Sequence, residues 1–245
     1  MQWVLGGGHG PNAPDQFVLH RARDGRLTGV MYVGMQAVLA ADDDPAVDAF
    51  AVELRRHPHM RSFVGPAHVV ERLWEDVKTW HPAPALRRPH QPLYALQRNA
   101  LRPAADVPVR PATLADAEIV IENSAEMMLG ELGYDPRENR LGFAAGVRRA
   151  IVLGSWWVWI AGGALRFQCN IGSHTRATAQ IQGVWTPPAA RKQGFATAAF
   201  SAVARRLLET HATLSLYVND FNADAIALYE RLGFVCVGEL ATLIF

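Results

Sequence analysis

The sequence predicts an α/β protein built from two domains. Its 245 residues suffice for two domains of the usual size, about 100–150 residues each. Half of the residues are hydrophobic, which is enough for packed cores and excludes a disordered chain. The segment LRPAADVP, residues 101–108, interrupts the periodic pattern with two prolines and small residues. We therefore expect a linker there, with domains at residues 1–104 and 105–245.

Strand-like and helix-like segments alternate before this linker, which indicates a smaller α/β domain of unknown role. Apolar residues Val47, Phe50 and Leu54 recur at helical spacing, and the residues around Leu73 do the same. The pattern predicts helices over residues 45–56 and 68–80, and strands over residues 30–40, 61–64 and 92–97.

The half after the linker has the expected order β-α-α-β-β-β-α-β-α-β. Thr113 is the expected N-cap of the first helix, with Asp116 in its first turn. Phe200, Val203 and Leu207 give the clearest helical spacing. The pattern predicts further helices over residues 139–150, 194–210 and 222–232, strands over 155–160, 164–171, 177–186 and 213–218, and two final strand segments on either side of Gly238.

The run VWTPPAARKQGFA, residues 184–196, predicts an anion site. It combines a short apolar strand, a Pro-Pro break and a basic turn that opens a helix. A helix start presents unpaired backbone N–H groups and the positive end of the helix dipole. Gly194 lets a phosphate approach the backbone, and Arg191 and Lys192 add positive charge.

This run and a second segment resemble the GCN5-related N-acetyltransferase (GNAT) family. RKQGFA, residues 191–196, matches the family's Arg/Gln-x-x-Gly-x-Gly/Ala coenzyme A loop, and NADAIALYERLGF, residues 222–234, matches its Asn-x-x-Ala-x-x-Leu-Tyr-x-x-x-Gly-Phe segment. The resemblance covers residues 107–245 and implies a mixed central sheet flanked by helices. IQGVWTPP and SLYVNDFN are further similar to a two-module bacterial subgroup. Its uncharacterised first module is expected to be the smaller α/β domain here, with a degenerate GNAT-like module as one option.

The resemblance implies that acetyl-CoA is the cosubstrate. Strand residues would offer backbone groups to the pantetheine arm, and the loop amides would hold the pyrophosphate. A strand edge and backbone donors suit a flexible anionic ligand. The expected coenzyme-binding residues are Val184, Trp185, Thr186, Arg191, Lys192, Gln193, Gly194, Phe195, Ala196, Thr197, Asn222 and Tyr229.

Three residues are catalytic candidates. Tyr229 occupies the tyrosine of the family's Leu-Tyr pair, and a phenol with a pKa near 10 can protonate the departing sulfur at neutral pH. The alternative is that Tyr229 only packs in the core. Asn219, after a strand, could reach the acetyl or acceptor region or simply stabilise a turn. Asn222 is expected to cap the last helix and to touch the coenzyme arm.

The general base is less clearly placed by the sequence. Many family members carry a glutamate near the position of Gln180, and neither Gln180 nor Gln182 accepts a proton at neutral pH. Glu126 is our candidate, with Glu122 and Glu131 as alternatives, and each also suits a solvated helix face. A bound water passing the proton to solvent would serve as well.

The predicted activity is acetyl transfer to a primary amine by direct attack in a ternary complex. Cys169 and Cys236 have no evident His partner, which argues against an acetyl-cysteine intermediate. The alternative is a non-catalytic acyl-CoA sensor or interaction module. The aromatic cluster Trp156, Trp157 and Trp159 suits core packing better than an acceptor wall, and alternation places Trp156 on the opposite face from the other two.

Composition argues against several other functions. A net charge of +1 without a basic stripe gives no attraction to nucleic acid or to an acidic membrane. Two cysteines suit a reducing compartment, and no apolar run spans a bilayer, so we expect a cytoplasmic protein. The nine histidines form no metal-binding pattern, so no metal is expected. The GGGHG run at residues 6–10 completes no dinucleotide fingerprint, because Pro11 follows it. The expected partner is a small-molecule or peptide amine, and a homodimer is one option.

Overall fold

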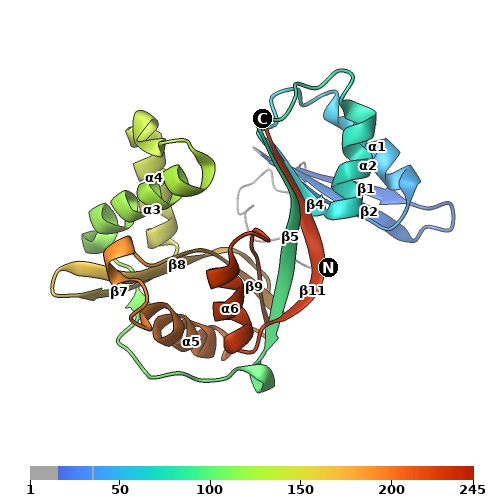
Figure 1. Cartoon of the computed structure of the whole chain (residues 1–245). Coiled ribbons are helices and arrows are strands. Elements are labelled where there is room, and N and C mark those ends of the chain that lie inside the picture. Colours follow the sequence, from blue (N-terminus) through green and yellow to red (C-terminus); the bar gives the residue numbers. More distant parts are fainter. Residues whose placement is uncertain (1–15, 35) are drawn as a thin grey trace. The chain divides into compact units, whose positions relative to one another are not determined.

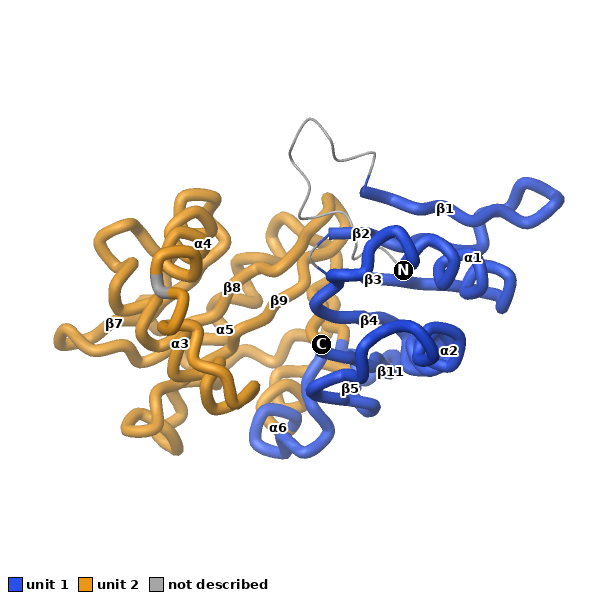
Figure 2. The backbone as a smooth tube through the Cα atoms, turned by 90° about the horizontal axis from the view of Figure 1, so that it is seen from above, with its two compact units in different colours: residues 1–94, 217–226, 236–245 blue, residues 95–216, 227–235 orange. Residues whose placement is uncertain are grey.

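The computed structural model describes residues 16–34 and 36–245, so the GGGHG run lies outside the described residues. The chain divides into two compact units (Figure 2). The first unit extends to Tyr94 and also contains residues 217–226 and 236–245. The second unit contains residues 95–216 and 227–235. The predicted boundary after residue 104 differs from this division, because the C-terminal strand belongs mainly to the first unit.

The first unit is a sheet whose strands follow the order β1-β2-β3-β4-β11-β5. β1 to β3 are antiparallel, β4 is parallel to β3, and β11 is antiparallel to β4. Phe50 of the first helix and Leu73 of the second pack in one core with Phe63 and Leu243 of the sheet. The elements are β1 (Phe17–Arg21), β2 (Leu27–Val33), β3 (Ala37–Ala41), α1 (Asp44–Leu54), β4 (Ser62–Pro66), α2 (Ala67–Val77), β5 (Leu86–Gln97) and β11 (Val235–Ile244).

The second unit is a sheet of order β10-β9-β8-β7-β6. Figure 1 shows α3 and α4 on one side of this sheet and α5 on the other. Ile121 of α3 and Ile151 of α4 pack against Trp156 and Val158 of β7. The elements are β6 (Arg110–Pro111), α3 (Ala117–Leu132), α4 (Arg140–Val152), β7 (Trp156–Ala161), β8 (Ala164–His174), β9 (Thr178–Trp185), α5 (Phe195–Leu207), β10 (Thr213–Tyr217) and α6 (Ala223–Arg231).

One succession of elements occurs twice along the chain. Residues 17–97 and residues 156–244 both run strand-strand-strand-helix-strand-helix-strand. In each copy the first three strands are antiparallel and the fourth is parallel to the third. This repeat supports the expectation that the N-terminal half is a degenerate copy of the C-terminal module.

The predicted elements are largely confirmed, with two corrections and one omission. The strand expected over residues 30–40 is two strands, because the chain turns at Gly34 between β2 and β3. The two final strand segments are one strand, β11, because Gly238 does not break the extended backbone. β1 was not predicted, since FVLHR is too short and mixed to show an alternating pattern.

The first turn of the second unit's helical region is fixed by Asp116. Thr113 and Asp116 form a reciprocal capping box, in which Thr113 is the N-cap of the 3-10 turn Leu114–Asp116. The N-cap of α3, which follows directly, is Asp116. The Arg110 guanidinium donates two bonds to the Asp116 carboxylate, at 2.7 and 2.9 Å. The Thr113 amide and hydroxyl donate to the same carboxylate, at 2.8 and 2.9 Å. These donors, Arg110 first, hold the pKa of Asp116 well below its usual range.

Asp116→Asn is expected to lower the free energy of unfolding by about 1.5–3 kcal/mol at pH 7, because it removes hydrogen bonds to a charged group. Since the folded pKa is depressed, this stability is present above the unfolded pKa near 4 and is lost as pH falls below it. The difference in the free energy of unfolding between wild type and Asp116→Asn should become smaller by roughly 1 kcal/mol between pH 7 and pH 3. Urea unfolding of both proteins at both pH values measures this difference. A difference that does not change with pH would contradict the lowered pKa of Asp116.

Candidate coenzyme and active site

The turn between β9 and α5 adopts a left-handed backbone at two positions. A short 3-10 turn, Pro188–Ala190, follows the strand and leads into the basic residues. Lys192 has φ 59°, the one positive φ of a non-glycine residue within the described chain, and Gly194 has φ 79° at the N-cap of α5. Left-handed residues in a tight turn orient successive amides toward the same side, which suits an anion.

Six consecutive amides at this turn are available to a ligand. Within the described chain, no backbone carbonyl accepts from the amides of residues 192–197, and the first bonded amide is Ala198, which donates to Gly194 O at 3.1 Å. No side chain caps the helix start. A Cβ added at Gly194 would meet nothing within 4 Å, so the space above the turn is open. Unpaired amides beside open space are the features that an anion site requires.

The two cations beside these amides differ in how firmly they are held. Arg191 Nε donates to Thr186 O at 3.0 Å, and its guanidinium carbon lies 4.7 Å from the centroid of the Trp185 ring. Both side chains are exposed, but these contacts hold Arg191 against the end of β9. Gln193 Nε2 donates to Ala189 O at 3.2 Å, which ties the turn together. The charge of Arg191 is preorganised for a nearby anion.

β9 leaves part of one edge unpaired. Its parallel pairing with β10 ends at Gln180 and Ser215, so the residues from Ile181 onward lie beyond that ladder. On the opposite edge, the register with β8 shifts between Gln182 and Trp185, where Gly183 has φ 62°. This bulge bends the strand and changes the direction of the backbone N–H and C=O groups around Val184. Trp185 Nε1 and Thr186 Oγ1 are buried and have no hydrogen-bond partner within the described chain.

The start of α1 provides an internal comparison. It occupies the place in the N-terminal copy that α5 occupies in the C-terminal copy. Asp42, Asp43 and Asp44 stand there instead of basic residues, and the Asp43 carboxylate accepts from the Ala46 amide at 3.0 Å. An acidic, already capped helix start repels anions. Of the two equivalent turns, the one at α5 suits a phosphate.

Tyr229 lies in the core of the second unit, 6% exposed. Its ring packs against Phe200 and Phe234, with centroid distances of 5.6 and 6.0 Å. Burial, and to a smaller extent the charge of Glu131, raise the pKa of Tyr229, so it keeps its proton at neutral pH. Burial also raises the pKa of the Cys169 thiol. Cys169 is thus a poor nucleophile.

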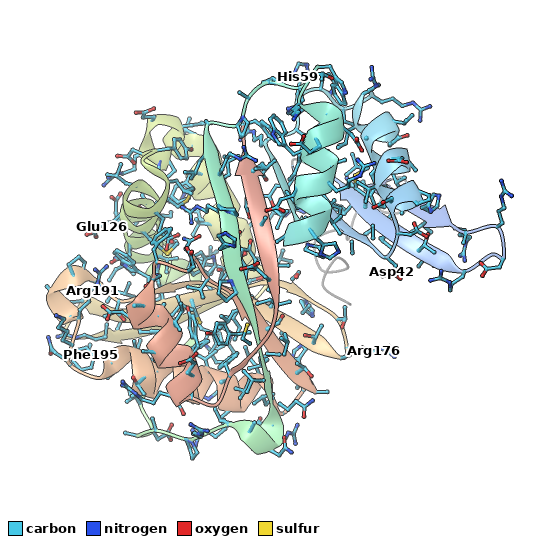
Figure 3. The ribbon with its side chains drawn as sticks, turned by 45° about the vertical axis from the view of Figure 1, so that its right-hand side comes forward. Asp42, His59, Glu126, Arg176, Arg191 and Phe195 are labelled. Carbon is cyan, nitrogen blue, oxygen red and sulfur yellow. The ribbon has the colours of Figure 1, made fainter. Side chains whose placement is uncertain are left out.

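The three candidate glutamates of α3 differ in their surroundings. Glu126 is exposed on the helix, and Figure 3 labels it together with Arg191 and Phe195 from the turn between β9 and α5. Glu122 pairs with Arg137 at 3.7 Å. Glu131 is the carboxylate whose charge acts on the Tyr229 phenol. Gln180 is buried and accepts from Ser173 Oγ at 3.3 Å.

Asn219 and Asn222 belong to the first unit, unlike the other candidate residues. Asn222 Oδ1 accepts from the Ala225 amide at 3.2 Å, which confirms its capping role. The Asn219 carbonyl accepts from the Asn222 amide at 3.0 Å, so Asn219 does form a turn. Its side chain is buried and accepts from Gln91 Nε2 at 3.0 Å. Sequence reasoning missed Gln91, since no local pattern distinguishes it.

The tryptophans of β7 follow the predicted alternation. Trp156 is buried among α3 and α4. Trp159 packs edge-on against Phe195 at 5.0 Å, and the Arg206 guanidinium carbon lies 5.9 Å from the Trp157 ring centroid, both on the α5 side.

Across residues 16–34 and 36–245, no three His, Cys, Asp or Glu side chains gather as a metal site would need. In the same residues, no helix combines the length and apolar character needed to cross a bilayer.

Two family models and several solved structures match the chain. Residues 17–120 match a domain of unknown function, DUF4081, and residues 130–234 match the Acetyltransferase (GNAT) family. No curated protein matches the sequence.

The similar solved structures share the fold at low sequence identity. A GNAT-family acetyltransferase from Colwellia psychrerythraea is 11% identical with a TM-score of 0.59, over 95% of this chain and 87% of that one. A GCN5-related N-acetyltransferase from Kribbella flavida is 17% identical with a TM-score of 0.60, over 95% and 91%. A tandem GNAT protein from the clavulanic acid biosynthesis pathway is 13% identical with a TM-score of 0.54, over 94% and 83%. These matches identify residues 130–234 as a domain of the Acetyltransferase (GNAT) family behind a DUF4081 domain at residues 17–120, and the solved structures show that the chain shares their fold.

Proposed function

We propose that this protein transfers the acetyl group of acetyl-CoA to a primary amine. The observation that carries the proposal is the run of six available amides, Lys192 to Thr197, beside the fixed guanidinium of Arg191. A diphosphate needs several donors and positive charge at short range, and this turn offers both. The acidic start of α1 makes this turn the better of the two repeated positions.

The coenzyme arm is proposed to lie along the free edge of β9. The backbone of Val184, Trp185 and Thr186 would serve the pantetheine amides, because this part of β9 extends beyond the pairing with β10. An amide-bearing chain that lies along a strand edge can satisfy backbone groups as a further strand would. The unpaired polar atoms of Trp185 and Thr186 fit a site that a ligand completes.

The proposed chemistry needs one proton acceptor and one proton donor. The ammonium gives one proton to the acceptor, and the neutral amine attacks the thioester carbon. The C–S bond breaks, the thiolate takes a proton from the donor, and the second proton of the nitrogen restores the donor through solvent. Tyr229 is the proposed donor, because its raised pKa keeps the phenol protonated. The proposed acceptor of the amine proton is a carboxylate of α3, Glu126, with Glu131 as the alternative; both side chains are exposed. Measuring kcat of Glu126→Gln and of Glu131→Gln over a range of pH identifies which carboxylate accepts the amine proton.

Tyr229→Phe is expected to lower kcat on the order of 100-fold, the lower end for loss of a general acid, because water can partly replace the phenol. The affinity for acetyl-CoA should stay within about twofold, since the ring still fills the same space between Phe200 and Phe234. Thiol release measures kcat, and calorimetry measures the affinity. An unchanged kcat would remove Tyr229 from the mechanism and leave it a packing residue.

The deciding experiment is thiol release from acetyl-CoA over a panel of amines that includes polyamines, amino acids, aminoglycosides and lysine peptides. Amine-dependent release supports the enzyme. Tight acetyl-CoA binding without amine-dependent release supports the second candidate, an acyl-CoA sensor, which the uncharged Gln180 favours because it replaces the usual glutamate. If acetyl-CoA does not bind, both candidates fail.

A further inference from the structure

Arg166 is the extra residue of a bulge in the second unit. Trp159 of β7 lies opposite Phe167 of β8. The next pair joins Ile160 to Leu165, so Arg166 stands between the two pairs without a partner on β7. A bulge bends the strand locally and redirects the side chain of its extra residue. The Arg166 side chain is therefore released from the alternation that its neighbours on the sheet follow.

Arg166 lies at the end of the sheet from which the turn to α5 leads. The pairing of β8 with β9 starts at Gln168, which lies opposite Trp185, the last residue of β9. Because these strands are antiparallel, the residues before Gln168 lie beside the chain that follows Trp185. That chain is the Pro-Pro break and the basic turn.

The Arg166 guanidinium reaches the first residue of α5. Its carbon lies 5.6 Å from the centroid of the Phe195 ring. Trp159 packs edge-on against the same ring, with a centroid distance of 5.0 Å, and so helps to hold the ring in place. The Phe195 amide is one of the six available amides of the turn. A further cation, in addition to Arg191 and Lys192, therefore lies next to the proposed anion site.

The N–H groups of Arg166 are available to a ligand. Within residues 16–34 and 36–245, its side chain forms no ion pair and no hydrogen bond. Other arginines of the same unit differ, since Arg110 is bound to Asp116 and Arg205 to Asp106. A guanidinium that stacks on a ring keeps its five N–H donors in its own plane, where they suit the oxygens of a phosphate.

Coenzyme A carries a second phosphate group that matches this cation. Besides the diphosphate, its ribose bears a 3′-phosphate with close to two negative charges at neutral pH. The proposed function assigns the diphosphate to Arg191 and the amides of residues 192–197. The 3′-phosphate is joined to the diphosphate through the ribose alone, so it must lie close to the same turn. A cation at short range would stabilise its charge there.

We propose that Arg166 binds the 3′-phosphate of the coenzyme, so that the protein distinguishes CoA from 3′-dephospho-CoA. This inference rests on the proposed acetyltransferase function, because it requires the diphosphate to lie at the start of α5.

Calorimetry with CoA and with 3′-dephospho-CoA tests the proposal. Wild type should bind CoA about 10-fold more tightly than 3′-dephospho-CoA, the effect of one charge-assisted contact. Arg166→Gln should bind CoA about 10-fold more weakly than wild type does, with its affinity for 3′-dephospho-CoA within about twofold of the wild-type value. Arg166→Lys should retain part of the preference for CoA, because it keeps the charge but not the planar donors.

Arg176→Gln is the matched control. Arg176 is exposed in the loop between β8 and β9, at the other end of both strands from the turn. Figure 3 labels it on the opposite side of the view from Phe195. This variant removes the same charge far from the coenzyme, so both affinities should stay within about twofold of wild type.

Equal weakening of CoA and 3′-dephospho-CoA binding in Arg166→Gln would overturn the inference, because Arg166 would then act on the diphosphate or on the packing of Phe195. A wild-type protein that binds both compounds equally would also overturn it, so the experiment decides even if Arg166→Gln does not fold. Either result leaves the acetyltransferase proposal standing. A wild-type protein that binds neither compound would defeat the proposed function, and the inference with it.

Discussion

Gly194→Asp is expected to weaken acetyl-CoA binding about 250-fold without unfolding the protein. The added carboxylate would stand where Gly194 now leaves open space above the amides of the α5 turn. Two unit charges about 5 Å apart repel by about 3.3 kcal/mol at an effective dielectric constant of 20. This free energy corresponds to the expected loss in affinity.

The fold should survive this change because Gly194 is exposed and at φ 79°, a conformation that Asp and Asn tolerate better than other side chains. Gly194→Asn is the matched control, since it adds the same shape without the charge. It should weaken binding by no more than about 10-fold, in line with lost access to the backbone alone. Calorimetry with acetyl-CoA at low and moderate salt measures both variants, and the Asp penalty should shrink as salt rises. Equal affinities of the Asp and Asn variants would refute an electrostatic anion site at this turn.

The fragment 105–245 is expected not to fold as a cooperative unit. Residues Leu240–Ile244 of β11 pair with Ser62–Pro66 of β4, which the fragment lacks. Leu240, Ala241 and Leu243 are nearly fully buried in the intact chain and would become exposed. Exposing a buried leucine costs about 1.5–3 kcal/mol, and the loss of two is a large share of the stability of a small domain. The fragment would also lose Gln91 and its bond to Asn219.

The matched control for the fragment is a chain cut within residues 104–107 by an inserted protease site. This stretch has no helix or strand, so both pieces should stay associated and retain the native circular dichroism spectrum. Thermal unfolding of the cut chain and of the fragment is monitored by circular dichroism. The fragment should show no cooperative transition or should aggregate. A fragment that unfolds cooperatively and binds acetyl-CoA like the whole chain would show that the second domain is autonomous.

The coenzyme turn could be predicted from the sequence because its parts are contiguous. Arg191, Gly194 and the start of α5 lie within a few residues, and local chemistry decides the conformation of such a turn. The helices were predictable for the same reason, since each carries its own hydrophobic period. Asn222 as a cap and the alternation of Trp156 and Trp157 are equally local properties.

Contacts between distant residues could not be predicted from the sequence. Gln91 and Asn219 are 128 residues apart, and a single glutamine in a strand has no pattern that names its partner. The pairing of β11 with β4 is also nonlocal, so the apolar run at the C-terminus predicted a strand but not the unit to which it belongs. The pKa of Tyr229 depends on burial by Phe200 and on Glu131, which only the fold brings together.

The placement of β11 has a consequence for the order of folding during synthesis. The first unit contains the earliest residues of the chain, yet its sheet includes Leu240–Ile244. The Phe245 ring packs edge-on against Phe63 and tilted against His81, with centroid distances of 4.8 and 4.2 Å. Domains that are contiguous in sequence can mature as soon as they emerge from the ribosome. Here β4 must wait, with an unprotected edge, until nearly 180 further residues have been translated, as the numbers of Pro66 and Leu240 imply. Nascent-chain aggregation, or a chaperone that shields β4, is therefore an expected feature of this protein's biogenesis.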